Sequence, residues 1–317
     1  MDTLLTTEFT GRTELPWGRS YAMVEPSQFR IDYAINPFMD TAVQPDPARA
    51  KAQWHRLVAT LRELGAEVHA IEARPDSPDM VYAMNLGLPV IGADADGASD
   101  PRVLLSHMRY PERQRETESA ADWFARHHHR AGRIGRDGVG PHFEAGDAFA
   151  WRGELVVGFG PRTEESALPL LAAELEVRVH GVRITHPGMY HLDLAFCPLD
   201  ERRALICPDA FDPASAAALL AAIPEPLVIT EEEALTTFCA NAVVIGRTVV
   251  MPGCPRHIAE QLTAWGFEVV VVDVSEFHLG GGSVRCLTNP LDVTVGRDLL
   301  RVPGGAVVLA QEGESAA

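Results

Sequence analysis

Residues 278–290 read HLGGGSVRCLTNP, and the rest of the chain can be interpreted outward from this stretch. Three consecutive glycines, Gly280 to Gly282, leave one turn of backbone without any Cβ, so a bulky planar group could approach the main chain there. Residues 267–274 (FEVVVVDV) precede them and predict a buried strand. Cys286 would then lie just beyond an ordered element, where a nucleophile can be held in place. Taken alone, Cys286 could equally be a small buried hydrophobe.

Composition limits the classes of function. The chain has 317 residues, 46% of them hydrophobic, which is enough for a sizeable core. Its 27 basic and 44 acidic residues give a formal net charge of -17, which disfavours nucleic acid and anionic membrane as partners and favours a small cationic substrate. We find neither an apolar run of about 20 residues nor a signal-peptide pattern, so we expect a cytoplasmic protein. The sequence leaves open whether it forms a homo-oligomer.

The cysteines and histidines do not predict a metal site. The five cysteines are odd in number and show neither a CxxC pair nor zinc-finger spacing, so we expect free thiols and no structural zinc. The HHH tract at 127–129 resembles the exposed end of a helix. Metal binding by this tract is disfavoured, because no acidic residue or cysteine flanks it. We therefore expect no metal and no cofactor.

One arrangement of elements recurs along the chain: an amphipathic helix, a break, a strand and then a polar motif. The predicted helices are residues 48–64, 118–129, 165–175, 213–223 and 255–265, and the motifs that close the units are 79–85, 142–147, 191–193, Asn241 and Cys286. About five units at a period near 45 residues favour a radial or stacked array, in which motifs at equivalent places converge. An ordinary open α/β sheet explains the alternation equally well. No linker divides the chain, so we expect an N-terminal surface segment, 1–19, and a single domain, 20–317.

The motif positions carry a thiol, an imidazole and several carboxylates. They are Asp79, Asn85, Glu144, Asp147, His191, Asp193 and Cys286. Thiol attack needs a thiolate, a general acid and base, and a group that orients the imidazole, and Cys286, His191 and Glu144 could fill these roles. The remaining carboxylates suit a cationic substrate such as a guanidinium, held by paired charge-assisted bonds. Each residue taken singly also has a structural explanation, as a cap, a surface ion pair or a core histidine.

Taken together, the motifs resemble the guanidino-group-modifying enzyme superfamily. The order PDMVYAMN, PERQ, HFEAGD, HLD and GGGSVRCLTNPL carries the resemblance over roughly residues 20–300, and HLD with GGGxxxC is its most specific part. The superfamily includes arginine deiminases, arginine dihydrolases, dimethylarginine dimethylaminohydrolases and amidinotransferases. The resemblance implies an α/β fold, the five-bladed propeller called the pentein fold, built from pseudo-repeated ββαβ units.

The resemblance also implies roles for particular residues. Cys286 matches the nucleophile, His191 the general acid and base, and Glu144 the carboxylate that orients the histidine. Asp193 matches the aspartate that binds guanidinium nitrogens, and Asp79 and Asn85 match further substrate-binding positions. Arg113 in PERQ and Arg162 in GFGPRT match arginines that hold the substrate α-carboxylate, with Arg109 as an alternative to Arg113. A solvated surface arginine is the plain structural explanation for both.

Asn85 departs from most of the superfamily. Deiminases and dimethylarginine hydrolases typically have an aspartate there, whereas arginine dihydrolases have an asparagine in a pattern that this chain nearly reproduces. An amide both donates and accepts, so it can hold a neutral ureido group as well as a guanidinium. We therefore expect a cysteine-dependent hydrolase that converts free L-arginine to ornithine, carbon dioxide and ammonia. The alternatives are a deiminase or dimethylargininase giving citrulline, an amidinotransferase, and a non-catalytic arginine-binding module. Asp193 disfavours the dimethylargininase alternative, because dimethylation removes hydrogen-bond donors that this carboxylate would accept.

Overall fold

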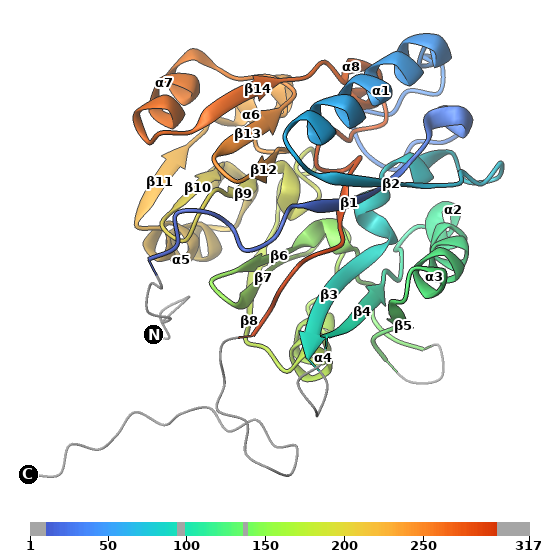
Figure 1. The fold of residues 1–317 in the computed structure, drawn as a ribbon, viewed down its shortest axis with the longest axis horizontal. Helices are drawn as coiled ribbons and strands as arrows, with labels where there is room; N and C mark the ends of the chain where they lie inside the picture. Colours follow the sequence, from blue (N-terminus) through green and yellow to red (C-terminus); the bar gives the residue numbers. More distant parts are fainter. Residues whose placement is uncertain (1–10, 94–98, 136–138, 297–317) are drawn as a thin grey trace, which may run out of the picture.

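Five separate three-stranded sheets make up the protein. The computed structural model describes residues 11–93, 99–135 and 139–296. In spatial order the sheets are β15 (Asn289–Pro290), β1 (Ser20–Val24) and β2 (Glu67–Ile71); β3 (Gly87–Ala93), β4 (Ser99–Leu105) and β5 (Arg130–Gly132); β6 (Ala148–Trp151), β7 (Glu154–Phe159) and β8 (Val179–Arg183); β9 (Phe196–Pro198), β10 (Arg203–Ile206) and β11 (Glu225–Val228); and β12 (Val243–Ile245), β13 (Thr248–Met251) and β14 (Glu268–Val271). They surround a common centre as the blades of a propeller (Figure 1). An open sheet, which the periodicity alone had allowed, is thereby excluded.

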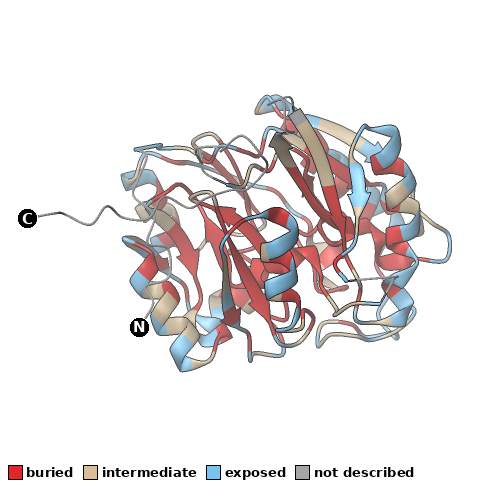
Figure 2. Ribbon diagram, turned by 90° about the horizontal axis from the view of Figure 1, so that it is seen from below, coloured by how far each residue is buried: buried red, intermediate tan, exposed pale blue. Residues whose placement is uncertain are grey.

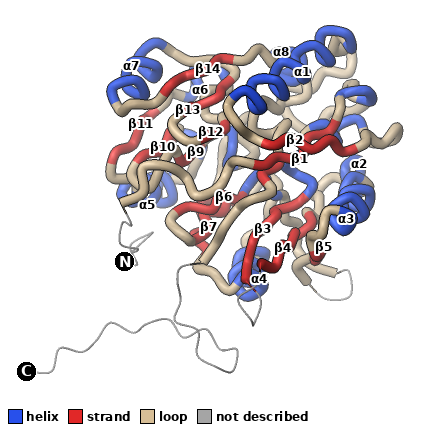
Figure 3. Tube along the Cα trace, viewed as in Figure 1, coloured by secondary structure: helices blue, strands red, loops and turns tan. Residues whose placement is uncertain are grey.

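Every blade has the same internal pairing. The central strand pairs antiparallel with one neighbour and parallel with the other. A parallel pair needs a long crossover, and helices supply it in each blade. These helices are α1 (Pro47–Glu63), α2 (Pro111–Gln114) with α3 (Glu116–Arg126), α4 (Ala167–Leu175), α5 (Pro213–Ala222) and α7 (Arg256–Ala264). The tube in Figure 3 shows them around the outside of the strands, which confirms the predicted ββαβ unit.

Shorter helices occupy the connections. They are the α-helices α6 (Glu231–Thr237) and α8 (Ser275–His278) and the 3-10 helices η1 (Pro26–Gln28), η2 (Pro78–Val81), η3 (Ala83–Leu86), η4 (Ala145–Asp147), η5 (Leu192–Leu194) and η6 (Pro208–Ala210). Three of the polar motifs predicted from the sequence fall on η3, η4 and η5 or beside them. Within the described residues, no helix is long and apolar enough to cross a membrane.

Two of the long helices begin where an aspartate is followed by proline. Asp46 accepts hydrogen bonds from the backbone N–H groups of Ala48 (2.8 Å) and Arg49 (3.0 Å) at the start of α1. Asp212 accepts one from Ser215 (2.7 Å) at the start of α5. The proline at the first helical position has no N–H that would need a partner. The predicted boundaries of these helices therefore agree with the structure to within a residue.

The ring is closed by the two ends of the ordered chain. β15 pairs with β1, with Pro290 opposite Tyr21 and Asn289 opposite Ala22. The Asn289 side chain also donates to the carbonyl oxygens of Ala83 and Gly87, both at 2.9 Å. Cys286 is thus held three residues before a strand that is anchored on two blades.

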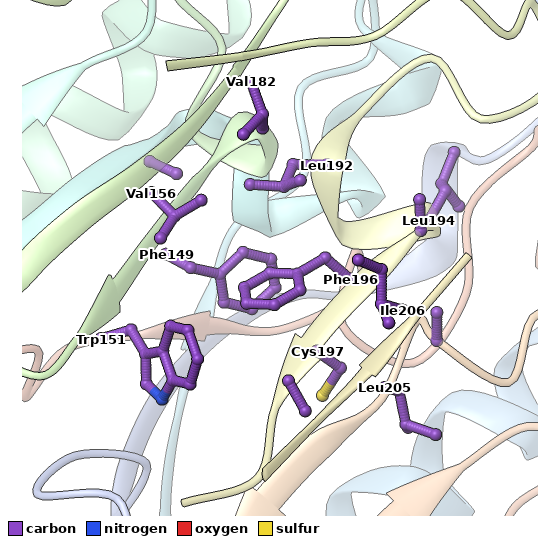
Figure 4. Packing of buried hydrophobic residues seen from close by; sticks show 14 of the residues in the cluster. Phe149, Trp151, Val156, Val182, Leu192, Leu194, Phe196, Cys197, Leu205 and Ile206 are labelled. Atoms are coloured by element: carbon purple, nitrogen blue, oxygen red, sulfur yellow. The ribbon is translucent and has the colours of Figure 1, made fainter. Parts of the chain in front are cut away.

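Aromatic side chains fill the space between neighbouring blades. Phe149 of β6 meets Phe196 of β9 edge to face, with ring centres 5.5 Å apart, and Trp151 packs on the same Phe196 at 5.7 Å (Figure 4). The Trp151 indole donates to the carbonyl oxygen of Asp200 (2.7 Å), so its polar atom is satisfied inside the core. Figure 2 shows the buried strands inside and helices exposed on their outer faces. This rigid centre supports the ends of the strands.

Two expectations about local structure were wrong. The run at 267–274 is not a buried strand, because β14 is the outer strand of its blade and Val271 is 56% exposed. Helix α8 also lies between β14 and the glycines. The described part of segment 1–19 is not confined to the surface, since Trp17 is buried and donates to the carbonyl oxygen of Ala150 (3.2 Å).

Candidate active site

Five of the motif residues come from equivalent places in the five blades. Each lies immediately before, or within a few residues of, the first strand of a sheet in the order given above. They are Asn85 before β3, Asp147 before β6, Asp193 before β9, Asn241 before β12 and Cys286 before β15. Asn85 and Cys286 line one cavity, and Asp193 and Asn241 both contact Cys286. The convergence expected for a radial array is therefore observed.

A small closed cavity lies beside Cys286. It is lined by Ile35, Asn36, Asp79, Tyr82, Asn85, Arg113, Arg162, Tyr190, His191, Gly280, Gly282 and Cys286. Six of the eight predicted site residues are in this lining, and the other two, Glu144 and Asp193, contact lining residues directly. All eight are thus brought together. The cavity volume of about 10 Å³ holds roughly one water molecule, so an amino acid can enter only if lining residues move apart.

Cys286 is buried between a carboxylate and an amide. Its Sγ lies 3.5 Å from Asp193 Oδ2 and 3.1 Å from Asn241 Nδ2. Burial, and then the nearby Asp193, raise the pKa of the Cys286 thiol well above its usual range. Burial also raises the pKa of Asp193, an effect that His191 and then Arg285 partly oppose. The sulfur therefore carries its proton and donates it towards Asp193.

His191 is oriented by Glu144. His191 Nε2 lies 2.7 Å from Glu144 Oε2, and Arg162 donates to the same oxygen at 3.2 Å. The other carboxylate oxygen accepts the backbone N–H of Arg109 at 3.0 Å. Burial opposes ionisation of Glu144, but Arg162 and His191 outweigh it and hold the pKa of this carboxyl well below its usual range. An ionised Glu144 favours the proton of a neutral imidazole on Nε2, which leaves Nδ1 as the basic nitrogen.

The two predicted carboxylate-binding arginines are buried rather than solvated. Arg113 and Arg162 are 4% and 2% exposed, whereas the side chain of Arg109 is 44% exposed and does not line the cavity. Arg113 donates twice to Glu116, from Nε and from Nη2, both at 2.8 Å. The guanidinium of Arg162 lies against the ring of Tyr190, 4.5 Å from its centre. The surface explanation therefore fails for both arginines.

The buried Arg113–Glu116 pair leads to a stability prediction. Glu116→Gln keeps the shape of the side chain but removes the charge of the carboxylate that accepts both bonds from the buried Arg113, while Asp79 stays nearby. We therefore expect a loss of about 1–3 kcal/mol in the free energy of unfolding. Urea unfolding of the variant and the native protein measures this. Glu112→Gln, an exposed position on α2, is the matched control and should cost less than about 0.5 kcal/mol. Equal stability of the two variants would contradict the prediction.

Asn85 is held in one orientation. Its Oδ1 accepts the backbone N–H of Gly146 at 2.8 Å, and Asn85 lines the cavity. With the carbonyl engaged, the NH2 group is the end left for the cavity. Across the cavity, burial raises the pKa of Asp79 to about 6, against the opposing effect of Arg113. One Asp79 oxygen, Oδ1, has no hydrogen-bond partner among the described residues.

The glycine run serves packing. A Cβ on Gly280 would lie 2.1 Å from the Tyr82 hydroxyl, and one on Gly282 would lie 2.3 Å from the Tyr82 ring. Gly281 has φ +84°, a conformation that favours glycine, and its carbonyl oxygen accepts from the Tyr190 hydroxyl at 2.7 Å. The planar groups that approach this backbone are thus two tyrosines of the protein.

Several residues of the site were not predicted. Asn241 was recognised as the fourth motif position but given no role, although it contacts the sulfur. Arg285, beside Cys286, is fully buried with its guanidinium 3.8 Å from the centre of the Phe149 ring. Ile35 and Asn36 line the cavity from a loop, and the Ile35 carbonyl oxygen accepts from Arg162 at 3.0 Å. Equivalence of the five motifs could have identified Asn241, whereas the loop residues had no sequence signal.

No metal-binding cluster is found in the described part of the chain. Within residues 11–93, 99–135 and 139–296, no group of three or more His, Cys, Asp or Glu side chains is arranged to hold a metal ion. His127 at the end of α3 instead stacks on Trp123, with ring centres 3.8 Å apart.

Comparison with known proteins agrees with this geometry. Residues 25–293 match the family described as N,N dimethylarginine dimethylhydrolase, eukaryotic. The chain is 36% identical over 275 residues to an N(G),N(G)-dimethylarginine dimethylaminohydrolase of Mycobacterium tuberculosis, covering 86% of each protein. It is 34% identical over 270 residues to a bifunctional arginine dihydrolase/ornithine cyclodeaminase of Synechocystis, covering 84% of this chain but 37% of that protein. The N-terminal domain of this cyanobacterial arginine dihydrolase, solved with bound substrate, superposes with a TM-score of 0.80 at 31% identity, over 87% of this chain and 99% of the domain.

The architecture and the comparisons define the class of protein. A ring of five ββαβ blades with a thiol, an imidazole and carboxylates converging at its centre is the pentein arrangement of guanidine-modifying enzymes. Within that class, the chain belongs to the N,N-dimethylarginine dimethylhydrolase family. It is therefore a hydrolase that acts on carbon–nitrogen bonds of linear amidines, and the interpretation as a non-catalytic binding module is set aside.

Proposed function

We propose that the protein hydrolyses the guanidino group of free L-arginine and continues to ornithine, carbon dioxide and ammonia. The observation that carries this proposal is the orientation of Asn85, whose carbonyl is engaged by Gly146 and whose NH2 group remains for the cavity. A guanidinium has only donors, whereas a ureido group has a carbonyl oxygen that accepts. A fixed NH2 donor therefore suits citrulline, the ureido intermediate, better than an aspartate in its place would.

The first half of the reaction needs the thiolate of Cys286. Sγ would attack the guanidinium carbon while Asp193 and Asp79 hold the guanidinium nitrogens, and the positive substrate would favour loss of the thiol proton. His191 would give a proton to the departing ammonia and then take one from the water that attacks the thioether-linked carbon. Release of the thiol yields citrulline. A second attack, now on the ureido carbon, would expel the second ammonia, and water would then displace the thiol. The product is the carbamate of ornithine, which breaks down to ornithine and carbon dioxide.

The other end of the substrate would be held by the arginines. Arg113 and Arg162 line the same cavity as Cys286, and both are buried, so each can offer a strong charge-assisted bond to an α-carboxylate. Arg162 also connects the cavity to the loop through the Ile35 carbonyl oxygen.

Dimethylarginine is the second candidate substrate. The match to the dimethylarginine hydrolase family and the 36% identical relative of that name favour it. Asp193 opposes this substrate, because the Asp193 carboxylate lies 3.5 Å from the sulfur and dimethylation removes hydrogen-bond donors that the carboxylate would accept.

Incubating the protein separately with arginine, dimethylarginine and citrulline, followed by mass analysis of the products, decides between the candidate substrates. Adding glycine as an amine acceptor to each reaction tests the amidinotransferase alternative. Turnover of dimethylarginine without turnover of arginine would overturn the proposal.

The raised pKa of Asp79 leads to a pH prediction. With its pKa raised to about 6, Asp79 is mostly ionised above pH 6 and mostly protonated below it. Guanidinium binding favours the ionised form, so the Kd for arginine should be constant above pH 7 and rise about tenfold for each pH unit below 6. Calorimetry with the Cys286→Ser variant measures binding without turnover. Neutral citrulline is the control ligand and should show a much weaker dependence. An arginine Kd that stays constant from pH 7 to pH 5 would contradict the assignment of Asp79.

A further inference from the structure

We propose that Asn241 is a catalytic residue that stabilises the thiolate of Cys286 by donating an N–H to its sulfur. This proposal rests on the role of Cys286 as the nucleophile. Asn241 Nδ2 lies 3.1 Å from Cys286 Sγ, and the Asn241 side chain is completely buried. The contact joins residues 45 positions apart in the chain and from two different blades.

The surrounding bonds determine which end of the Asn241 amide faces the sulfur. Its Oδ1 accepts two backbone N–H groups, from Arg285 at 2.9 Å and from Cys286 at 3.2 Å. Its Nδ2 also donates to the backbone carbonyl oxygen of Asp193 at 3.1 Å. A flipped amide would place its oxygen against that carbonyl and its NH2 against two donors, so the observed orientation is strongly preferred. Both nitrogen hydrogens and the oxygen are thereby used.

The contact favours the charged form of the cysteine. A thiol sulfur is a weak acceptor, whereas a thiolate is an anion that forms charge-assisted hydrogen bonds. An N–H directed at the sulfur is therefore worth more after deprotonation than before it. This effect opposes burial and Asp193, both of which disfavour the thiolate. The Asn241 N–H thus partly replaces the solvation that the Cys286 thiolate loses on burial.

Asn241 also sets the position of the sulfur relative to its neighbours. One side chain connects the loop before β12 with the backbone of Cys286 and with the backbone of Asp193, which follows His191 by two residues. The nucleophile and the carboxylate that faces it are therefore held by the same amide. Its Oδ1 meets a structural need as the acceptor for the N–H groups of Arg285 and Cys286, but that need does not require an N–H directed at the sulfur.

The test compares the thiolate fraction of Cys286 at a given pH between the native protein and its variants. The rate of alkylation by iodoacetamide is followed from pH 6 to pH 11, and the modified peptide is quantified by mass so that only Cys286 is counted. Asn241→Ala removes the donor, and we expect the thiol pKa to rise by at least about one unit, a tenfold smaller thiolate fraction at a given pH. Asn289→Ala is the matched control, because Asn289 is equally buried three residues after Cys286 and donates to Ala83 and Gly87 but not to the sulfur. It should lower the melting temperature without moving the thiol pKa.

Two further comparisons keep the proposal open to refutation. Asn241→Asp retains an oxygen for the two backbone N–H groups and places a second oxygen against the sulfur, so it should raise the thiol pKa even if the alanine variant fails to fold. A folded Asn241 variant whose Cys286 titrates as in the native protein would overturn the proposal and leave Asn241 a structural role. Because alkylation needs no substrate, the result is independent of which amidine the enzyme hydrolyses. Turnover that survives in Cys286→Ser would instead overturn the proposed mechanism.

Discussion

Cys286→Ser is expected to abolish the hydrolysis of arginine, with kcat lowered by a factor on the order of 10³ or more. The variant differs from the native protein by one atom, so the cavity and its bonds to Asp193 and Asn241 are largely retained. A serine hydroxyl, however, loses its proton far less readily than a thiol and is a far weaker nucleophile than a thiolate. Loss of turnover with retained arginine binding, followed by product mass and by calorimetry, is the expected pair of results.

Two controls make this result specific. Cys254→Ser changes a half-buried cysteine that does not line the cavity, and it should leave kcat within a factor of about two. Prior treatment of the native enzyme with a chelator should leave its activity unchanged, because the proposed nucleophile is a thiol rather than a metal-bound water. Activity that is lost on chelation but survives in the Cys286→Ser variant would refute the covalent mechanism.

The fold could be predicted where local signals were unambiguous. The helices predicted at 48–64 and 213–223 agree to within a residue with α1 and α5, whose starts are capped by Asp46 and Asp212. The repeated alternation predicted the units, but it could not distinguish five separate sheets from one. Closure of the ring depends on pairing between β15 and β1, at opposite ends of the chain, which no local pattern encodes. The valine-rich run before α8 was misassigned for a related reason, since an outer strand packed on a helix can be as apolar as a buried one.

The residues of the candidate site could be predicted from the sequence, whereas the contacts that hold them could not. The residue types of Cys286, His191 and Glu144 indicated thiol chemistry, and the structure brings them together with the five predicted substrate-binding residues. What the sequence could not show is which partners each side chain already has. The fork of Arg113 is held by Glu116, and the carbonyl of Asn85 is held by Gly146. Such contacts depend on backbone positions that only the folded ring defines.

The position of Asn85 leads to the prediction that most directly tests the second hydrolysis. In Asn85→Asp one carboxylate oxygen can still accept the N–H of Gly146, so the local backbone should be unchanged. The other oxygen would replace the NH2 group and face the ureido oxygen of citrulline, acceptor against acceptor. Losing that hydrogen bond and adding a buried charge without a cationic partner should cost about 1–3 kcal/mol, which is roughly tenfold to a hundredfold in turnover of citrulline.

Arginine itself serves as the internal control for this variant, because a guanidinium is cationic and has only donors, so an added carboxylate should hold it at least as well as the amide does. Arginine consumption should therefore continue while citrulline accumulates, and the ratio of citrulline to ornithine after arginine is exhausted should rise at least tenfold over the native value. Equal loss of both steps would mean that Asn85 acts on the thiol or the backbone rather than on the ureido group. If the native enzyme already stops at citrulline, the dihydrolase proposal is wrong and the deiminase alternative replaces it.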